Sequence, residues 1–220
     1  MGVAPVTLEY EYQGPKRGVE QAVLLAHGAG ADMHAKALTT VADALAEAKI
    51  ASLRFNYPYK TAGRKAPDRP AVLMASTRKA IAELATRTKL PADRLVIGGR
   101  SMGGRYCSLV AGDEDDPVAV RGLLLLGYPL HAAGKPEKER SDHFPRLKMP
   151  VAFVSGTRDS LAGKDALTKA AKLVKGKVTF HWLESADHGF RPLKASGLTT
   201  DDVLAHVAAF SVDWVRAQQG

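Results

Sequence analysis

Residues 95–104 read LVIGGRSMGG, an apolar run that leads directly into a serine flanked by glycines. The run at 95–98 predicts a buried strand, and residues 102 to about 112 predict a helix. A serine between a strand and a helix in the pattern G-x-S-x-G is typical of a strained turn that exposes its hydroxyl. The helix directs its N-terminal amides at the same point, which favours negative charge on a reacting oxygen. The segment predicts that Ser101 is a nucleophile.

The alternation of apolar runs and amphipathic stretches continues on both sides of this segment. Further strands are predicted at 8–12, 22–26, 51–55, 123–127, 151–155 and 178–183. Several are apolar on both faces, as in a parallel sheet covered by helices. Helical faces with a 3.6-residue period are predicted within 38–45, 73–84, 167–174 and 203–214. This order predicts a doubly wound α/β fold with a mainly parallel sheet and helices on both faces, in which ligands bind at the carboxyl ends of the strands.

Length and composition limit the class of protein. The 220 residues are 45% hydrophobic and contain no linker-like stretch, so we expect one domain covering residues 1–220. The single cysteine, Cys107, cannot form an internal disulfide, and we interpret it as a small buried hydrophobe. The first residues lack the pattern of a signal peptide, so we expect a cytoplasmic protein. No apolar run approaches the ~20 residues that span a bilayer, so no membrane partner is expected.

The formal net charge of +8 raises the question of nucleic-acid binding. Lysine and arginine are spread along the chain and are diluted by acidic residues in most predicted helices. We therefore expect no nucleic-acid partner and interpret the charge as a solvated basic surface, which would also attract anionic substrates. The histidines show no metal-ligand spacing, so neither a metal nor another cofactor is expected.

Two loops at the same predicted sheet edge carry partners for the serine. Asp159 follows the sixth predicted strand, and His188 follows the seventh. The chain order Ser, Asp, His accompanies the G-x-S-x-G turn in hydrolytic triads. We expect His188 to take the proton of Ser101 and to give it to the leaving group, while Asp159 fixes the imidazole tautomer. Asp187 is the less suitable acid, because it is the chain neighbour of His188 and reaches Nδ1 poorly.

A glycine-rich turn, HGAGA at 27–31, follows the second predicted strand. Its glycines allow the backbone to come close to a reacting oxygen. We expect the amides of Ala29 and Met102 to form an oxyanion hole, with Gly28 as the less suitable first donor. We interpret His27 as a structural residue that fixes this turn.

Six segments in this order resemble a known family. They read HGAGAD at 27–32, RFNYPY at 54–59, GGRSMGGR at 98–105, GYPLH at 127–131, GTRD at 156–159 and DHGF at 187–190. The chain resembles the α/β-hydrolase superfamily, within it the dienelactone-hydrolase-like group, and there the compact relatives of a nonspecific-lethal complex subunit and of a testis-expressed protein. True dienelactone hydrolases use a cysteine nucleophile where this chain has Ser101, so their substrate is not carried over. Relatives often have proline after the acid, where this chain has Ser160.

Basic and aromatic residues near Ser101 bear on the substrate. Residues that flank the serine or the loop after the third predicted strand are Arg54, Lys60, Arg64, Lys65 and Arg100. They form an anion-attracting rim, or Arg54 and Arg100 pair with acids beneath the site, and both readings remain open. The residues that we expect to contact the substrate are Gly28, Arg100, Tyr57 and Tyr128. The charged segment at 132–143 has no long apolar face, so no substantial cap or lipase-like lid is expected.

These expectations combine into a serine hydrolase that cleaves a small carboxylester or related acyl bond through an acyl-enzyme. Its partner is then a small acyl substrate, which is anionic if the basic rim binds it. The alternative is a non-catalytic interaction module. The resemblance to the nonspecific-lethal complex subunit, which is part of a chromatin complex, favours this alternative, whereas the presence of all three triad residues is evidence against it. The residues do not distinguish esters, thioesters, lactones and small amides, and they give no oligomeric state.

Overall fold

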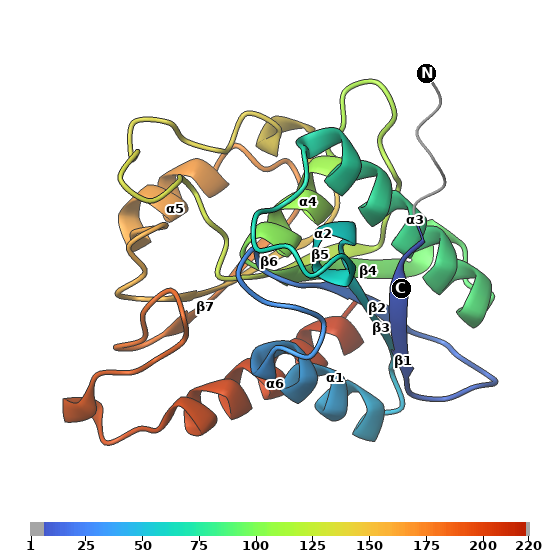
Figure 1. Ribbon diagram of the computed structural model, residues 1–220. Helices are drawn as coiled ribbons and strands as arrows, with labels where there is room; N and C mark the ends of the chain where they lie inside the picture. The colour runs from blue at the N-terminus through green and yellow to red at the C-terminus, as the bar shows by residue number, and fades with distance from the viewer. Residues whose placement is uncertain (1–6, 219–220) are drawn as a thin grey trace.

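The computed structural model describes residues 7–218 and contains a seven-stranded sheet between two layers of helices (Figure 1). The ends of the predicted domain, residues 1–6 and 219–220, lie outside the described residues. The strands are β1 (Glu9–Gln13), β2 (Ala22–Ala26), β3 (Ala51–Asn56), β4 (Leu95–Arg100), β5 (Gly122–Leu126), β6 (Val151–Gly156) and β7 (Val178–Leu183). Their order across the sheet is β1-β3-β2-β4-β5-β6-β7. β1 is antiparallel to β3, and the other neighbouring pairs are parallel, so the predicted α/β class is confirmed.

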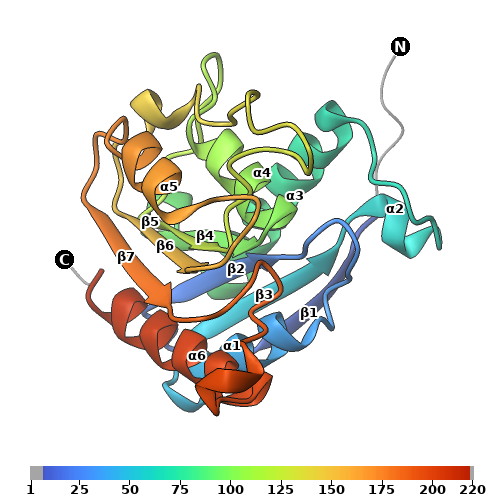
Figure 2. The ribbon, with the colours of Figure 1, turned by 90° about the vertical axis from the view of Figure 1, so that its left-hand side faces the viewer.

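Helices cover both faces of the sheet, as expected for a doubly wound fold (Figures 1 and 2). On one face lie α1 (Lys36–Glu47) and α6 (Thr200–Arg216). On the other face lie α2 (Pro58–Thr61), α3 (Pro70–Thr88), α4 (Met102–Ala111) and α5 (Lys164–Ala171). Short 3-10 turns occur at η1 (Ala92–Arg94), η2 (Phe144–Arg146) and η3 (Lys194–Ser196). Within the described residues, the segment between β5 and β6 contains η2 and no longer helix.

The sheet divides the hydrophobic core into two layers. Successive side chains of a strand point to opposite faces. Leu24 and Ile97 therefore pack on the side of α3 and α4, whereas Val23 and Val96 pack on the side of α1 and α6. All four are nearly or fully buried. Burial of each such side chain stabilises the fold by about 1.5–3 kcal/mol, so both helical layers are held to the sheet by the strands that carry the site.

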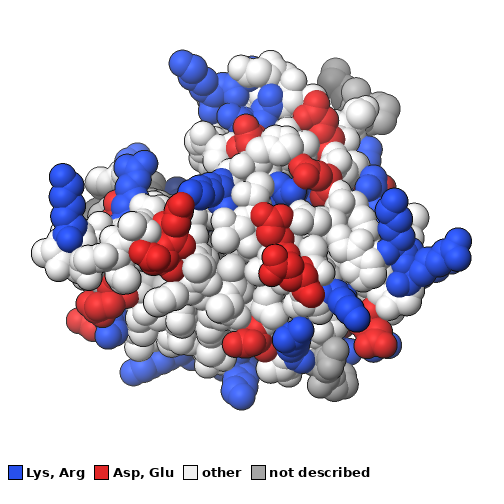
Figure 3. Space-filling view, turned by 90° about the horizontal axis from the view of Figure 1, so that it is seen from below, with Lys and Arg blue, Asp and Glu red and all other residues white. Residues whose placement is uncertain are grey.

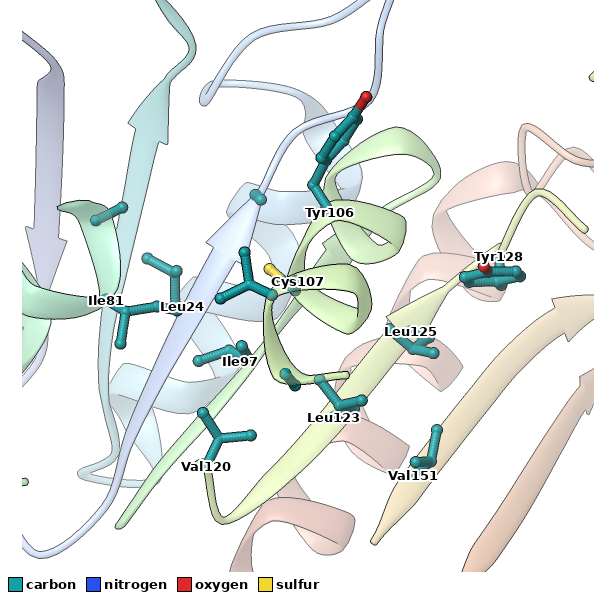
Figure 4. Close-up of a cluster of buried hydrophobic side chains, with 14 of the residues drawn as sticks. Leu24, Ile81, Ile97, Tyr106, Cys107, Val120, Leu123, Leu125, Tyr128 and Val151 are labelled. Carbon is teal, nitrogen blue, oxygen red and sulfur yellow. The ribbon is translucent and has the colours of Figure 1, made fainter. Parts of the chain in front are cut away.

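The larger layer lies beneath α4 and contains the single cysteine (Figure 4). Cys107 is fully buried between α4 and the strands, in the same cluster of side chains as Leu123 and Leu125. Its thiol donates to the carbonyl oxygen of Gly98 at 3.2 Å. Burial raises the pKa of the thiol far above its ordinary value. The interpretation of Cys107 as a small buried residue of the core is confirmed.

Charged side chains are interspersed on the face formed by α1 and α6. Figure 3 shows lysine and arginine next to aspartate and glutamate there, with uncharged areas between them. One ion pair on this face joins Lys36 to Asp201. This face therefore presents no continuous basic surface. Within residues 7–218, none of the helices combines the length and the hydrophobicity that crossing a membrane requires.

Candidate active site

The turn between β4 and α4 holds Ser101 in a backbone conformation that side chains rarely adopt. Its φ is 50° and its ψ is −115°. The N–H of Ser101 donates to the carbonyl of Leu126 at 2.9 Å, and its own carbonyl accepts the N–H of Arg105 at 3.0 Å. A positive φ at a residue with a side chain is strained and persists only when its surroundings fix it. The two hydrogen bonds, to β5 and within α4, provide that constraint.

Two glycines allow β4 and α4 to approach β2 closely enough to form this turn. A Cβ at Gly99 would lie 2.1 Å from the carbonyl oxygen of Ala26, and one at Gly103 would lie 2.3 Å from the same oxygen. Both distances are far shorter than a van der Waals contact, so any side chain at either position would push the elements apart. The close approach places Ser101 beside the turn that follows β2.

Ser101, His188 and Asp159 form a continuous hydrogen-bonded row. The Oγ of Ser101 lies 3.0 Å from Nε2 of His188, and the carboxylate oxygens of Asp159 lie 2.8 and 3.0 Å from Nδ1. The side chain of Asp159 is 0% exposed, whereas that of His188 is 24% exposed. If Nδ1 carries the proton that Asp159 accepts, Nε2 has a free lone pair directed at the serine hydroxyl. The structure thus brings together the three residues that the sequence singled out.

Asp187 has a different task from Asp159. Its Oδ1 accepts the N–H of Gly189 at 2.7 Å and the N–H of Arg191 at 2.9 Å. These bonds shape the loop on which His188 stands. Asp159 comes from the separate loop after β6 and reaches Nδ1, which agrees with the preference for Asp159 as the acid.

His27 fixes the turn that follows β2. The N–H of Tyr57 donates to its Nε2 at 3.1 Å, which leaves Nδ1 to donate to the carbonyl of Gly28 at 2.8 Å. Burial lowers the pKa of the ring. The hydroxyl of Tyr59 donates to the carbonyl of Ala29 at 2.8 Å. Both ring nitrogens of His27 are therefore used in structure, in agreement with its predicted role.

The amides that we expect to form an oxyanion hole belong to two elements, α4 and the turn after β2. Met102 is the first residue of α4, and the first amides of a helix have no partner within it. Ala29 lies in the exposed turn after β2. A Cβ at Gly28 would lie 3.6 Å from the Cβ of Ser101, so this turn runs directly beside the nucleophile.

Two tyrosines that we expected to contact the substrate are core residues, so this prediction was wrong. Tyr57 is 0% exposed, and its hydroxyl lies 3.0 Å from Oγ1 of Thr77. Tyr128 is 1% exposed, and its hydroxyl donates to the carbonyl of Arg140 at 2.5 Å. Both side chains turn inward from the strand ends and offer no surface to a ligand. The direction of a side chain just after a strand is set by tertiary packing, which the local sequence does not encode.

Arg54 and Arg100, which the sequence analysis considered together, have different surroundings. The buried Arg54 forms an ion pair with Glu11 at 2.8 Å and is a structural residue. The guanidinium of Arg100 lies 4.4 Å from the centre of the Phe190 ring and 3.3 Å from the carbonyl oxygen of Leu126. Burial lowers the pKa of Arg100 to about 10, against the attraction of acidic groups nearby. Arg54 thus pairs with an acidic residue, as one of the two interpretations expected. Arg100 instead contacts the carbonyl of Leu126 and the ring of Phe190.

The basic loop after β3 is partly neutralised. Arg64 forms an ion pair with Asp68 at 2.5 Å. The carboxylate of Asp68 also accepts the N–H of Tyr59 at 2.8 Å. Lys60 and Lys65 remain as basic residues of this loop, so an anion-attracting rim at this position is smaller than the sequence suggested.

Comparison with known proteins agrees with this architecture. The model of the alpha/beta hydrolase domain family matches residues 19–216. The chain belongs to this family. Residues 19–216 include the strands β2 to β7 and every residue of the Ser101, Asp159 and His188 row.

Solved structures similar to this α/β hydrolase share its fold. An alpha-beta serine hydrolase homologue from Coxiella burnetii has a TM-score of 0.72 at 19% identity, covering 94% of this chain and 90% of that chain. A dienelactone hydrolase from Anabaena variabilis has a TM-score of 0.72 at 19% identity, covering 98% and 94%. A serine hydrolase without a lid from Xanthomonas campestris has a TM-score of 0.67 at 20% identity, covering 96% and 91%.

The sequence did not single out two residues that shape the site of this α/β hydrolase. Tyr59 holds the carbonyl of Ala29, and Phe190 lies under the guanidinium of Arg100. Both lie in segments that carry the family resemblance, RFNYPY and DHGF, which was the signal available for them. Across residues 7–218, no group of three potential metal ligands occurs.

Proposed function

We propose that this α/β hydrolase is a serine hydrolase that cleaves a small carboxylester or a related acyl bond through an acyl-enzyme. The observation that carries the proposal is the row from Ser101 Oγ to His188 Nε2 and from Nδ1 to the buried carboxylate of Asp159. The exposed turn beside the serine and the strained backbone of Ser101 support it. A buried carboxylate, an imidazole and a hydroxyl in this order are suited to proton transfer from the hydroxyl.

In the first half of the reaction, Ser101 Oγ attacks the acyl carbon and forms a bond to it. Nε2 of His188 takes the hydroxyl proton, and Asp159 stabilises the resulting imidazolium through Nδ1. The bond to the leaving group then breaks, and Nε2 gives the proton to the departing oxygen. The product is an acyl-enzyme on Ser101 together with the released alcohol.

In the second half, water attacks the acyl carbon while Nε2 of His188 takes its proton. The bond to Ser101 Oγ then breaks, Nε2 returns the proton to Oγ, and the carboxylic acid is released. The tetrahedral oxyanion of both steps is held by the amides of Met102 and Ala29. One such donor contributes about 3–4 kcal/mol to the stabilisation of a transition state. Tyr59 and His27 hydrogen-bond to the carbonyls of the turn after β2 and thereby keep the amide of Ala29 beside the serine.

The substrate is a small or soluble acyl compound. The segment between β5 and β6 carries only the short turn η2, so the described chain has no helical cap above the serine. The similar structure from Xanthomonas campestris is described as a serine hydrolase without a lid. An open site of this kind admits short acyl groups.

Covalent labelling with a fluorophosphonate probe tests the proposal. Wild type is expected to be labelled at Ser101, as located by mass spectrometry of the modified peptide, and Ser101→Ala is expected to be unlabelled. Ser160→Ala is the matched control, because Ser160 is an exposed serine beside Asp159. A folded wild type that neither reacts with the probe nor hydrolyses short acyl esters and thioesters would contradict the proposal and would favour the non-catalytic interaction module.

A further inference from the structure

Arg105 is a partly buried arginine on the helix that begins at the nucleophile. It lies one turn into α4, where its N–H donates to the carbonyl of Ser101 at 3.0 Å. Its Nε is shielded from water and has no hydrogen-bond partner in the described structure. Leaving a buried charged donor unpaired is costly. The Arg105 side chain hydrogen-bonds with the hydroxyl of Tyr128, so its Nε is the donor left for an acceptor from outside the chain.

Arg140 brings a second positive charge to Arg105. Its backbone is fixed at both ends, because its N–H donates to Leu130 at 2.7 Å and its carbonyl accepts the hydroxyl of Tyr128 at 2.5 Å. Burial and then the positive charge of Arg105 lower the pKa of Arg140. The hydroxyl of Tyr128 contacts both the carbonyl of Arg140 and the side chain of Arg105, so the two arginines lie on either side of the same tyrosine. Neither forms an ion pair within residues 7–218, in contrast to Arg54, Arg64, Arg78, Arg87 and Arg146.

Aromatic side chains form the wall behind these charges. The guanidinium of Arg105 lies 5.6 Å from the centre of the Tyr106 ring. Figure 4 places Tyr106 and Tyr128 toward the carboxyl ends of the strands, which is the edge that carries Ser101. Both tyrosines are buried and shield one side of the arginines from water. Charge–charge attraction is stronger where water is partly excluded.

We propose that Arg105 and Arg140 form an anion-binding subsite that holds a negatively charged group of the acyl substrate beside Ser101. This inference rests on the proposed hydrolase function and names the class of its substrate. Guanidinium groups match carboxylate and phosphate oxygens with paired hydrogen bonds. The subsite differs from the expected rim of basic residues after β3 and from Arg100. Tyr128 acts in it as a positioning residue through its bond to the carbonyl of Arg140.

Two esters of equal acyl length test the subsite. The probes are 4-nitrophenyl hexanoate, which is neutral, and mono-4-nitrophenyl adipate, which ends in a carboxylate. Wild type is expected to show the higher kcat/KM for the adipate ester, and this preference is expected to weaken as salt is added. Arg105→Gln and Arg140→Gln are each expected to lower the adipate-to-hexanoate ratio of kcat/KM about tenfold or more. A phosphonate-ended ester of the same length shows which anion is preferred.

Charge-matched variants separate the subsite from a general effect of net charge. Arg216→Gln removes one exposed positive charge from α6 and is expected to leave the ratio unchanged. Arg105→Lys keeps the charge but loses the paired donors, so it is expected to give an intermediate ratio. Free adipate is expected to slow fluorophosphonate labelling of wild type and to have no such effect on Arg140→Gln. This last measurement reports binding without turnover.

The outcomes distinguish this inference from the proposed function on which it rests. Wild type that is labelled at Ser101 but hydrolyses both esters equally would overturn the subsite and leave the hydrolase function intact. The same conclusion would follow if folded Arg140→Gln lost activity on both esters in the same proportion. Wild type that is neither labelled nor active on any of the esters would overturn both proposals.

Discussion

The carboxylate of Asp159 lies 2.8 Å from Nδ1 of His188, although 29 positions separate the two residues in the chain. β6 and β7 are parallel neighbours, and Gly156 pairs with Leu183 where the two strands end. The loops that follow them therefore leave the same edge of the sheet side by side. The hydrogen bond between acid and base is a consequence of this topology.

The proposed nucleophile and base are expected to act as one unit. Ser101→Ala and His188→Ala should each reduce kcat by roughly 10⁴ or more, and the double variant should be no worse than either single variant. Steady-state hydrolysis of a short 4-nitrophenyl ester measures this. Losses that multiply in the double variant would show that the two residues work independently.

The two aspartates near His188 are expected to differ in their effects. Asp159→Asn should lower kcat by about 10⁴, because an amide does not hold the imidazole tautomer that leaves Nε2 free. Asp187→Asn should cost less than tenfold, since its Oδ1 can still accept the loop amides. Kinetics of the two variants side by side decide the assignment, and a dead Asp187→Asn beside an active Asp159→Asn would reverse it.

The contact between α4 and β2 predicts a large effect on stability at one glycine. Gly103→Ala should lower the free energy of unfolding by about 1–3 kcal/mol or more, because its Cβ would lie 2.3 Å from the carbonyl oxygen of Ala26. Gly30→Ala is the control, as a Cβ there meets nothing within 4 Å. Urea denaturation measures both. Equal stabilities would show that the turn is looser than this contact implies.

Stability is expected to fall in acid because of His143. Burial, followed by the positive charges of Arg105 and Arg146, lowers the pKa of His143 from 6.5 to about 3. Between these values the unfolded chain binds a proton that the folded chain does not, so this contribution to stability is complete above pH 6.5 and is lost as the pH falls toward 3. Within this window a full proton difference gives about 1.4 kcal/mol per pH unit.

Denaturation at pH 7 and pH 5 tests this linkage in wild type and in His143→Gln. The glutamine amide can replace Nε2, which lies 2.8 Å from Oγ of Ser108 inside the fold. Wild type should lose more stability than the variant between the two pH values. The same loss in both proteins would assign the acid sensitivity to other groups.

The strands and the order of Ser101, Asp159 and His188 along the chain could be predicted, because apolar runs and this residue order are visible in the sequence. The contact between the three side chains depends in addition on the topology of the sheet. β2 and β7 have the predicted bounds, and Ser101 lies at the predicted junction of strand and helix. The antiparallel direction of β1 had no local signal, since it depends on how the chain returns to β3. The partners of Arg54 and Arg100 and the inward turn of Tyr57 were equally hidden, because each is fixed by residues distant in sequence.

The full burial of Cys107 has a practical consequence. The chain contains one cysteine, and its thiol is fully covered by α4 and the sheet. Ser101→Cys would therefore introduce the one solvent-accessible thiol of the protein, and Cys107 would not have to be removed first. Alkylating reagents, mass tags or spectroscopic labels would then attach to that variant at position 101, in the turn between β4 and α4, and not at Cys107.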